Sequence, residues 1–187
     1  MRILSALALT LALAACDKPA APAAAPVEPA AAPAPAAMPL RLALDSEGLI
    51  AILAETGSTQ ALPFSRQKSQ TLVTMTRVEP APGKESTNAE CGAGPLAFVA
   101  WPDGLTLLFQ DDRFAGWTVD APGLTTRDGI GVGATLAALK AAYPDVVVEE
   151  STLGTEFTAG ALGGLLDGKG PDARVTNLWA GVTCMFR

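Results

Sequence analysis

The chain contains no histidine among its 187 residues. This absence excludes Ser-His-Asp and Cys-His catalysis, zinc sites built on imidazole, haem ligation by histidine and pH switching by histidine. Charged residues make up only 17% of the chain, against ~25% in typical soluble domains. We therefore expect a protein that is not an enzyme, with no catalytic residues, no metal site and no cofactor.

Basic side chains are also scarce. The chain has 13 lysines and arginines against 19 acidic residues, and its formal net charge is −6. Nucleic-acid phosphates and anionic lipid surfaces both require clustered basic side chains. The composition therefore argues against nucleic-acid binding and against a polybasic membrane patch.

The N-terminus has the pattern of a secretory signal. Met1 and Arg2 give a short positive start, and residues 3–14 form an apolar run. A membrane-spanning helix needs ~20 apolar residues, so this run is too short to span. A positive start, a short apolar core and small residues indicate a signal peptide over residues 1–15.

The signal ends in an aliphatic residue, two small residues and a cysteine, namely Leu13-Ala14-Ala15-Cys16. This pattern resembles the lipobox of bacterial lipoproteins. The resemblance implies cleavage before Cys16, diacylglycerol on its sulfur and a further acyl chain, such as palmitate, on the new amino group. Because two or three acyl chains hold a protein durably at a membrane, we expect an anchor at Cys16 in the inner or outer membrane of the cell envelope. The rest of the chain would then lie on the periplasmic side.

Residues 16–37 are predicted to form a tether behind the lipidated cysteine. Residues 18–37 hold six prolines and eleven alanines. Proline removes an amide donor and fixes φ, so neither a helix nor a sheet can propagate. An extended chain of this kind reaches up to roughly 60 Å at ~3.1 Å per residue. It could be a spacer that lifts the domain from the membrane or a linker of no selected length.

Residues 38–187 have the length of one domain. The patterns predict a hairpin of residues 40–44 and 49–53, then a helix capped by Ser65 and ending near Val78. A polar loop over residues 80–95 follows. Three strands of a meander are predicted over 96–101, 105–110 and 114–119.

The second part of this domain repeats that order. A glycine-rich stretch over residues 129–135 starts a helix over 136–143, and strands follow over 146–150, 155–158 and 162–166. A closing hairpin is expected over 174–179 and 182–187. Two halves, each with a short helix before an antiparallel meander, indicate an α+β fold. We expect one antiparallel sheet with both helices packed on one face.

Cys91 and Cys184 are left once Cys16 carries lipid. Two remaining cysteines in an exported protein are expected to pair. The alternative is a redox or thiol site, but the two are not arranged as C-x-x-C. A disulfide closing so long a loop would stabilise the fold by about 4–5 kcal/mol in the chain-entropy model.

Several motifs suggest chemistry that their surroundings do not support. Gly129-x-Gly131-x-x-Ala134 fits a dinucleotide-binding pattern, but no hydrophobic strand precedes it. Ser65-x-x-Lys68 fits the S-x-x-K of penicillin-binding enzymes, but the companion motifs are absent. We interpret the first as the start of a helix and Ser65 as a helix cap.

Acidic and aromatic residues allow similar alternatives. Asp167 and Asp172 lack the alternating oxygens of a calcium loop, so a solvated turn is favoured. The glutamates could form an acid/base pair, but neighbours in a strand point to opposite faces; they are Glu149, Glu150 and Glu156. The tryptophans could line a pocket or a partner surface, but core positions are favoured; they are Trp101, Trp117 and Trp179.

A further resemblance concerns the start of the second helix. The pattern is Gly131-x-Gly133-x-Thr135-x-x-x-Leu139-x-x-x-Tyr143-Pro144. It resembles small envelope lipoproteins of the SmpA/OmlA type and β-lactamase-inhibitor-like domains. The resemblance implies short helices packed on an antiparallel sheet and a role in binding proteins. It assigns no functional residue.

These observations leave three hypotheses for function. The first is an envelope lipoprotein, anchored through Cys16, whose non-catalytic domain binds another envelope protein or serves assembly. The second is a module that binds a small ligand or the cell wall, through the sheet face or the stretch 129–135. The third is a hydrolase that uses carboxylates alone, which requires two of them in one cleft.

Overall fold

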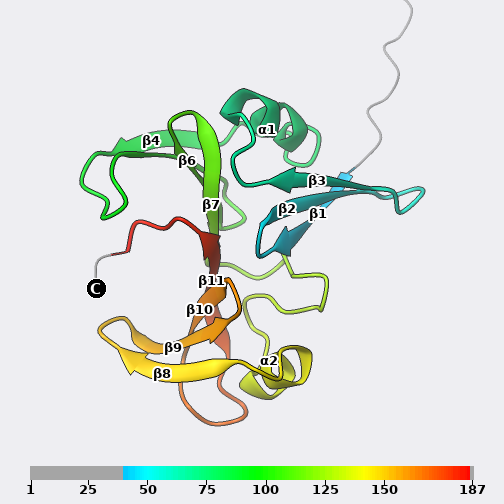
Figure 1. Ribbon diagram of the computed structural model, residues 1–187. Helices are drawn as coiled ribbons and strands as arrows, with labels where there is room; N and C mark the ends of the chain where they lie inside the picture. The colour runs from blue at the N-terminus through cyan, green and yellow to red at the C-terminus, as the bar shows by residue number, and fades with distance from the viewer. Residues whose placement is uncertain (1–39, 186–187) are drawn as a thin grey trace, which may run out of the picture. The chain divides into compact units, whose positions relative to one another are not determined.

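The structure is a computed structural model that describes residues 40–185, which belong to one unit of the chain, Ala36–Arg187. Within the described residues, the fold is α+β with antiparallel strands and two short helices, as expected (Figure 1). The strands form two sheets, however, and not the single sheet that the sequence suggested. The small sheet has the order β1-β2-β3, and the large sheet has the order β4-β5-β6-β7-β11-β10-β9-β8.

The elements have the following bounds. The small sheet contains β1 (Leu40–Asp45), β2 (Gly48–Leu53) and β3 (Thr59–Pro63). The helices are α1 (Lys68–Met75) and α2 (Leu136–Ala142). One half of the large sheet contains β4 (Lys84–Asn88), β5 (Leu96–Ala100), β6 (Leu105–Gln110) and β7 (Arg113–Val119). The other half contains β8 (Val147–Ser151), β9 (Gly154–Ala159), β10 (Leu162–Leu166) and β11 (Val175–Gly181).

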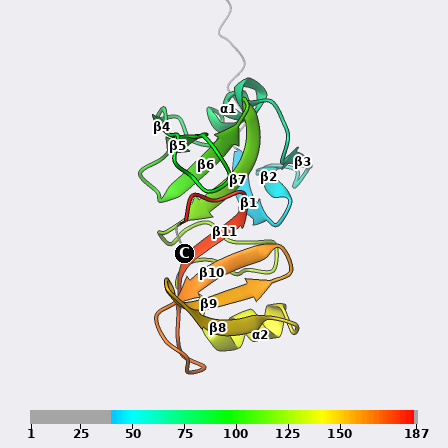
Figure 2. The same ribbon diagram turned by 60° about the vertical axis from the view of Figure 1, so that its left-hand side comes forward.

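The large sheet consists of two halves with the same topology. Helix α1 precedes the meander β4–β7, and α2 precedes the meander β8–β11. The last strands of the two meanders, β7 and β11, pair antiparallel and join the halves at the centre of the sheet (Figure 2). Thr118 lies opposite Trp179 at the middle of this pair. The halves are therefore related by an approximate two-fold axis that passes near these two residues.

An arginine holds the start of each helix in the same way. Arg113 Nη1 donates to the carbonyl oxygen of Ser65 at 2.9 Å, and Arg174 Nη1 donates to that of Gly133 at 2.9 Å. Ser65 and Gly133 both have positive φ, 68° and 93°. Arg113 is the first residue of β7, and Arg174 immediately precedes β11; these two strands form the central pair. The local frame around each helix is thus repeated although the residues differ.

Further features of the backbone recur at matching positions. Each residue before a helix forms an antiparallel bridge with one of these arginines, and each third strand carries an irregularity in register. These are the bridges Gln67–Arg113 and Thr135–Arg174 and the shifts at Leu108–Phe109 and Leu165–Leu166. The two halves therefore share a pattern of backbone hydrogen bonds more than a pattern of side chains. This explains why the repeat is hard to see in the sequence.

The core lies between one face of the large sheet and the layer formed by α1, α2 and the small sheet. Trp117 of β7 is fully buried there, and its Nε1 donates to the carbonyl oxygen of Asp45 at 2.9 Å. This bond attaches the small sheet to the centre of the large one. Trp101 and Trp179 are also buried, so the prediction that the tryptophans are core residues is confirmed.

A disulfide covers the opposite face of the first half. Cys91 and Cys184 are bonded, as predicted, with their Cα atoms 4.9 Å apart. Together with Val182 they pack on Phe98 and Leu108, which point away from the main core. The disulfide indicates an oxidising compartment outside the cytosol.

Two predictions about the first helix region are wrong. Ser65 does not cap α1: its backbone N–H bonds to the Phe114 carbonyl, and the helix begins at Lys68 after Gln67, which makes no side-chain cap. The predicted loop over residues 80–95 contains strand β4. Its side chains are almost all polar and exposed because it is an edge strand, so apolar alternation could not reveal it. Strand β3 was also not predicted.

The predicted closing hairpin is wrong as well. Strand β11 passes through Ala180 and Gly181 without a turn, because it is paired with β10 on one side and β7 on the other. Both of its edges are therefore occupied, and no third strand can return along it. Residues 182–185 are not a strand. Residues 186–187 of the predicted hairpin lie outside the described residues.

Candidate functional site

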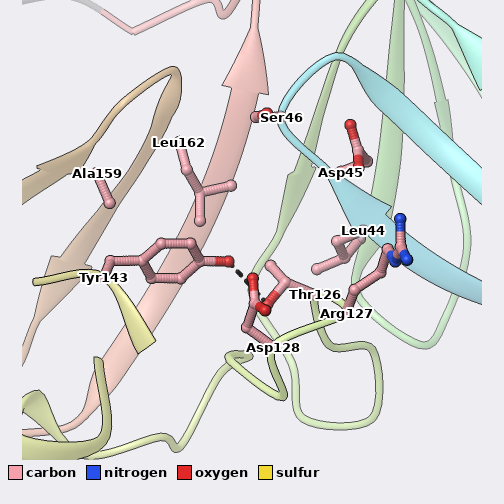
Figure 3. A pocket seen from close by; sticks show the side chains of 9 residues that line it. All are labelled: Leu44, Asp45, Ser46, Thr126, Arg127, Asp128, Tyr143, Ala159 and Leu162. Carbon is pink, nitrogen blue, oxygen red and sulfur yellow. Dashed lines mark hydrogen bonds between the residues drawn. The ribbon is translucent and has the colours of Figure 1, made fainter. Parts of the chain in front are cut away.

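A pocket of about 380 Å³ lies where the small sheet meets the second half of the large sheet (Figure 3). It is formed by the β1–β2 turn, the loop before α2, the end of α2 and the β9–β10 hairpin. We name it the Tyr143 pocket. Its lining residues are Leu44, Asp45, Ser46, Thr126, Arg127, Asp128, Tyr143, Ala159 and Leu162.

Backbone hydrogen bonds hold the loop side of the Tyr143 pocket. Leu44 N–H donates to the Thr125 carbonyl at 2.9 Å, which ties β1 to this loop. Thr126 is buried, its N–H bonds to the Ile130 carbonyl at 2.7 Å, and its Oγ1 accepts from the Ile130 N–H at 3.2 Å. The Thr126 hydroxyl is therefore fixed in place by the backbone.

Tyr143 reaches this loop from the end of α2. Its hydroxyl donates to Thr126 Oγ1 at 3.1 Å, and Figure 3 shows the Asp128 carboxylate beside the same hydroxyl. Burial raises the pKa of the Tyr143 phenol above its usual value, the Thr126 bond opposes this rise, and the charges of Asp128 and Asp45 add to it. The phenol is consequently neutral at physiological pH and sits in a negative field.

The internal repeat explains why space is left here. Ala159 ends β9 and pairs with Leu162 across the turn into β10. At the matching turn of the first half, Trp101 N–H bonds to the Leu105 carbonyl at 2.9 Å. Trp101 and Ala159 therefore occupy equivalent positions, and an indole in one half is replaced by a methyl group in the other.

The first half is filled at the equivalent place. The Trp101 indole packs between the β5–β6 turn and the end of α1, and its Nε1 donates to the Ala81 carbonyl at 3.2 Å. Only about 140 Å³ remains there, beside Met75 and Glu79. The Tyr143 pocket is thus the vacant counterpart of a site that the first half closes with its own tryptophan.

The lining of the Tyr143 pocket combines an apolar side with an acidic rim. Leu44, Ala159 and Leu162 supply the apolar surface. Among residues 40–185, Asp45 and Asp128 take part in no salt bridge. Figure 3 shows the guanidinium of Arg127 directed away from the Tyr143 hydroxyl. The arrangement suits a group with an apolar body and a positively charged end.

The residues highlighted in the sequence do not meet at this site. Cys16 lies outside the described residues. The stretch 129–135 follows the pocket loop but contributes no lining residue, and no strand leads into Gly129. Lys68 Nζ bonds to Glu85 at 2.8 Å, so this lysine is engaged in a salt bridge.

Two of the remaining acidic candidates, Asp167 and Glu150, have hydrogen-bond partners. Asp167 Oδ1 accepts the Arg174 N–H at 2.7 Å, as suits a turn. Glu149 and Glu156 lie opposite each other in the β8–β9 pair, and Glu150 points to the other face. Hydrogen bonds from Thr155 and Lys169 lower the pKa of Glu150. No group of three or more potential metal-ligating side chains occurs in the part of the chain that the structure describes.

Known proteins give little guidance beyond this geometry. No protein-family model matches the chain, and no curated protein matches it. Among solved structures, the chain is similar to that of the uncharacterized protein yfeY from Escherichia coli. The TM-score is 0.49 and the sequence identity is 10%, over 75% of this chain and 99% of that one. The resemblance to the SmpA/OmlA and β-lactamase-inhibitor-like families stays a prediction.

Proposed function

We propose that this chain is a lipid-anchored binding protein of the bacterial cell envelope, and that its domain is non-catalytic. Its Tyr143 pocket would hold one projecting group of an envelope protein. The observation that carries the proposal is the exchange of Trp101 for Ala159 between equivalent positions. A space that the fold can close with its own side chain, and does close in one half, is open in the other.

The chemistry of the pocket favours a basic side chain as the bound group. A lysine or arginine buries an apolar stem and keeps a charged head at a polar rim. The stem would lie on Leu44, Ala159 and Leu162, and the head would face Asp45 and Asp128. The neutral Tyr143 phenol adds an aromatic ring and a hydrogen-bonding hydroxyl.

In-cell photo-cross-linking tests the pocket. A benzophenone amino acid at Ser46, on the pocket rim, should capture a defined partner, whereas the same probe at the exposed Lys140 should not. Adding Ala159→Trp should fill the pocket and abolish the Ser46 adduct. An adduct that survives Ala159→Trp would place the partner elsewhere and contradict the proposal.

The proposed anchor rests on the resemblance at Cys16 and on the oxidising compartment that the disulfide indicates. Within residues 40–185, no helix is long and apolar enough to cross a membrane. Metabolic labelling with an alkyne fatty acid should mark the wild-type protein, and Cys16→Ser should remove both the label and firm membrane association. An unlabelled wild-type protein would refute the anchor.

A carboxylate-based hydrolase is the second candidate, because Asp45 and Asp128 line one pocket. General acid–base chemistry on a glycosidic bond uses two carboxyl groups about 5–10 Å apart. A hydrolysis screen of the wild type beside Asp45→Asn and Asp128→Asn separates the two proposals. Turnover that both variants lose would favour the hydrolase.

A further inference from the structure

A second hollow of the molecule lies away from the Tyr143 pocket, between α1 and β3. It encloses about 550 Å³. In Figure 1, α1 lies next to β3, which is an edge strand of the small sheet. We name it the α1–β3 groove. Its lining residues are Gln60, Arg66, Ser69, Gln70, Val73, Thr74 and Arg77.

The helix wall of the α1–β3 groove is cationic at both ends. Arg66 precedes α1 and Arg77 follows it. Gln70 and Val73 lie between them on one face of the helix, because residues spaced by three or four positions share a face. Neither arginine forms a salt bridge within the described residues, and no carboxylate lines the groove. The Arg66 Nε is buried without a hydrogen-bond partner. Val73 is 67% exposed between the two arginines.

The outer edge of β3, next to the lining residue Gln60, offers unpaired backbone groups. Leu53 N–H bonds to the Ser58 carbonyl and Phe64 N–H to the Glu47 carbonyl. Since hydrogen-bonded and non-bonded pairs alternate along an antiparallel ladder, Thr59 and Ala61 direct their N–H and C=O groups to the outer edge. No other part of the described chain bonds to these groups.

We propose that the α1–β3 groove binds an extended acidic segment of a partner protein, which adds a strand to β3 and places two carboxylates against Arg66 and Arg77. Strand addition supplies main-chain bonds, and side chains at alternate positions give specificity. The exposed Val73 would pack on an apolar residue of the segment. This surface shares no residue with the Tyr143 pocket.

The geometry sets the spacing of the carboxylates. The two arginines flank α1, whose eight residues span about 12 Å. In an extended strand the first and fifth residues are about 13 Å apart, at ~3.3 Å per residue. Acidic side chains at the first and fifth positions point to the same face and reach both arginines. A second copy of this chain offers the groove no acidic residue, because its β3 (Thr59–Pro63) carries no charged side chain.

Fluorescence anisotropy on the full-length protein in a non-ionic detergent tests the proposal. The probe is a labelled Glu-Val-Thr-Val-Glu peptide. Arg66→Glu with Arg77→Glu should weaken its binding about tenfold, as expected when two ion pairs at the protein surface are turned into repulsion. Arg41→Glu with Lys140→Glu makes the same change of charge outside the groove and should leave binding unchanged. A Lys-Val-Thr-Val-Lys peptide should instead prefer the reversed groove.

Two further arms keep the test decisive. Arg66→Gln with Arg77→Gln removes the attraction without adding repulsion and should weaken binding about threefold, even where the glutamate variant folds poorly. N-methylation of the peptide backbone should abolish binding. Equal binding to all variants would overturn the proposal, and so would insensitivity to N-methylation. Self-association in sedimentation, or loss of binding to phosphatidylglycerol vesicles alone in the glutamate variant, would assign the groove to another occupant and overturn it too.

Discussion

The two halves of the large sheet share one hydrogen-bonding frame but are filled differently. In the first half, Trp101 fills the space behind the β5–β6 turn, and the Cys91–Cys184 disulfide covers the outer face. In the second half, Ala159 leaves the Tyr143 pocket. The comparison teaches that the frame, fixed by backbone bonds and two arginines, determines the fold. The side chains that fill it determine where a pocket is left.

The two halves also differ in how the N-termini of their helices are capped. Helix α2 is capped by Thr135, whose Oγ1 accepts the Ala138 N–H at 3.1 Å, whereas Gln67 makes no side-chain cap for α1. The half with the vacant pocket therefore has the better-terminated helix. Substitutions that remove a feature of one half, or give it the corresponding residue of the other half, test this comparison.

The largest expected effect comes from emptying the filled site. Trp101→Ala removes a buried indole and its bond to the Ala81 carbonyl, so it should lower the free energy of unfolding by about 3–5 kcal/mol. Chemical denaturation of the oxidised protein measures this. A loss below about 1 kcal/mol would mean that the first half does not depend on its tryptophan, and the comparison would fail.

Removal of the disulfide should have the second-largest effect on stability. Replacing Cys91 and Cys184 together by alanine opens a closed loop of sequence separation 93 and should cost about 2–5 kcal/mol. Thermal unfolding at fixed pH compares this variant with the wild type. Hydrogen exchange should rise most around Phe98 and Leu108, which the bridge covers. A uniform rise over both halves would contradict a role limited to the first half.

The helix caps predict a smaller, asymmetric effect. Thr135→Ala should destabilise the fold by about 1 kcal/mol, while Gln67→Ala should change stability little, because only the former removes a cap bond. Gln67→Thr should add a cap to α1 and stabilise it. Urea unfolding of the three variants ranks them. Equal losses for Thr135→Ala and Gln67→Ala would remove this difference between the halves.

The smallest effect concerns Glu79, beside the filled site. Burial, and secondarily the charge of Asp103, raises the pKa of the Glu79 carboxyl above its usual value of 4.5. The fold therefore favours the protonated form, and the stability associated with it is present below pH 4.5 and is lost as pH rises through the raised pKa. Glu79→Gln should be slightly stabilising at pH 7 and neutral at pH 4. A stabilisation by Glu79→Gln that increases as the pH falls would contradict this account.

The sequence predicts the strands of the two meanders where apolar residues alternate between tight turns. It predicts the disulfide because two cysteines remained. It misses β4, whose residues from Lys84 to Asn88 are polar on an exposed edge. It splits β11 because Ala180-Gly181 resembles a turn, and only the pairing on both sides keeps this strand straight.

The Tyr143 pocket could not be predicted from local patterns. Asp45, Thr126, Tyr143 and Ala159 come from four segments that meet only after the sheets pack. The pocket could be inferred from the equivalence of Ala159 and Trp101. This equivalence can be recognised only when the strand register of both halves is known. Tyr143 stood in the sequence pattern at the end of the second helix, but its position there gave no hint of a pocket.

The central claim is that the Tyr143 pocket is the unfilled equivalent of the Trp101 site. The free energy of unfolding of Ala159→Trp tests this claim most directly. An indole at position 159 should enter the space of about 380 Å³ beside Tyr143 as Trp101 does in the other half. The account predicts a free energy of unfolding within about 1 kcal/mol of the wild type, since well-accommodated apolar additions cost little. A loss of more than about 3 kcal/mol, as expected when a large side chain is forced into an occupied core, would show that the two positions are not equivalent.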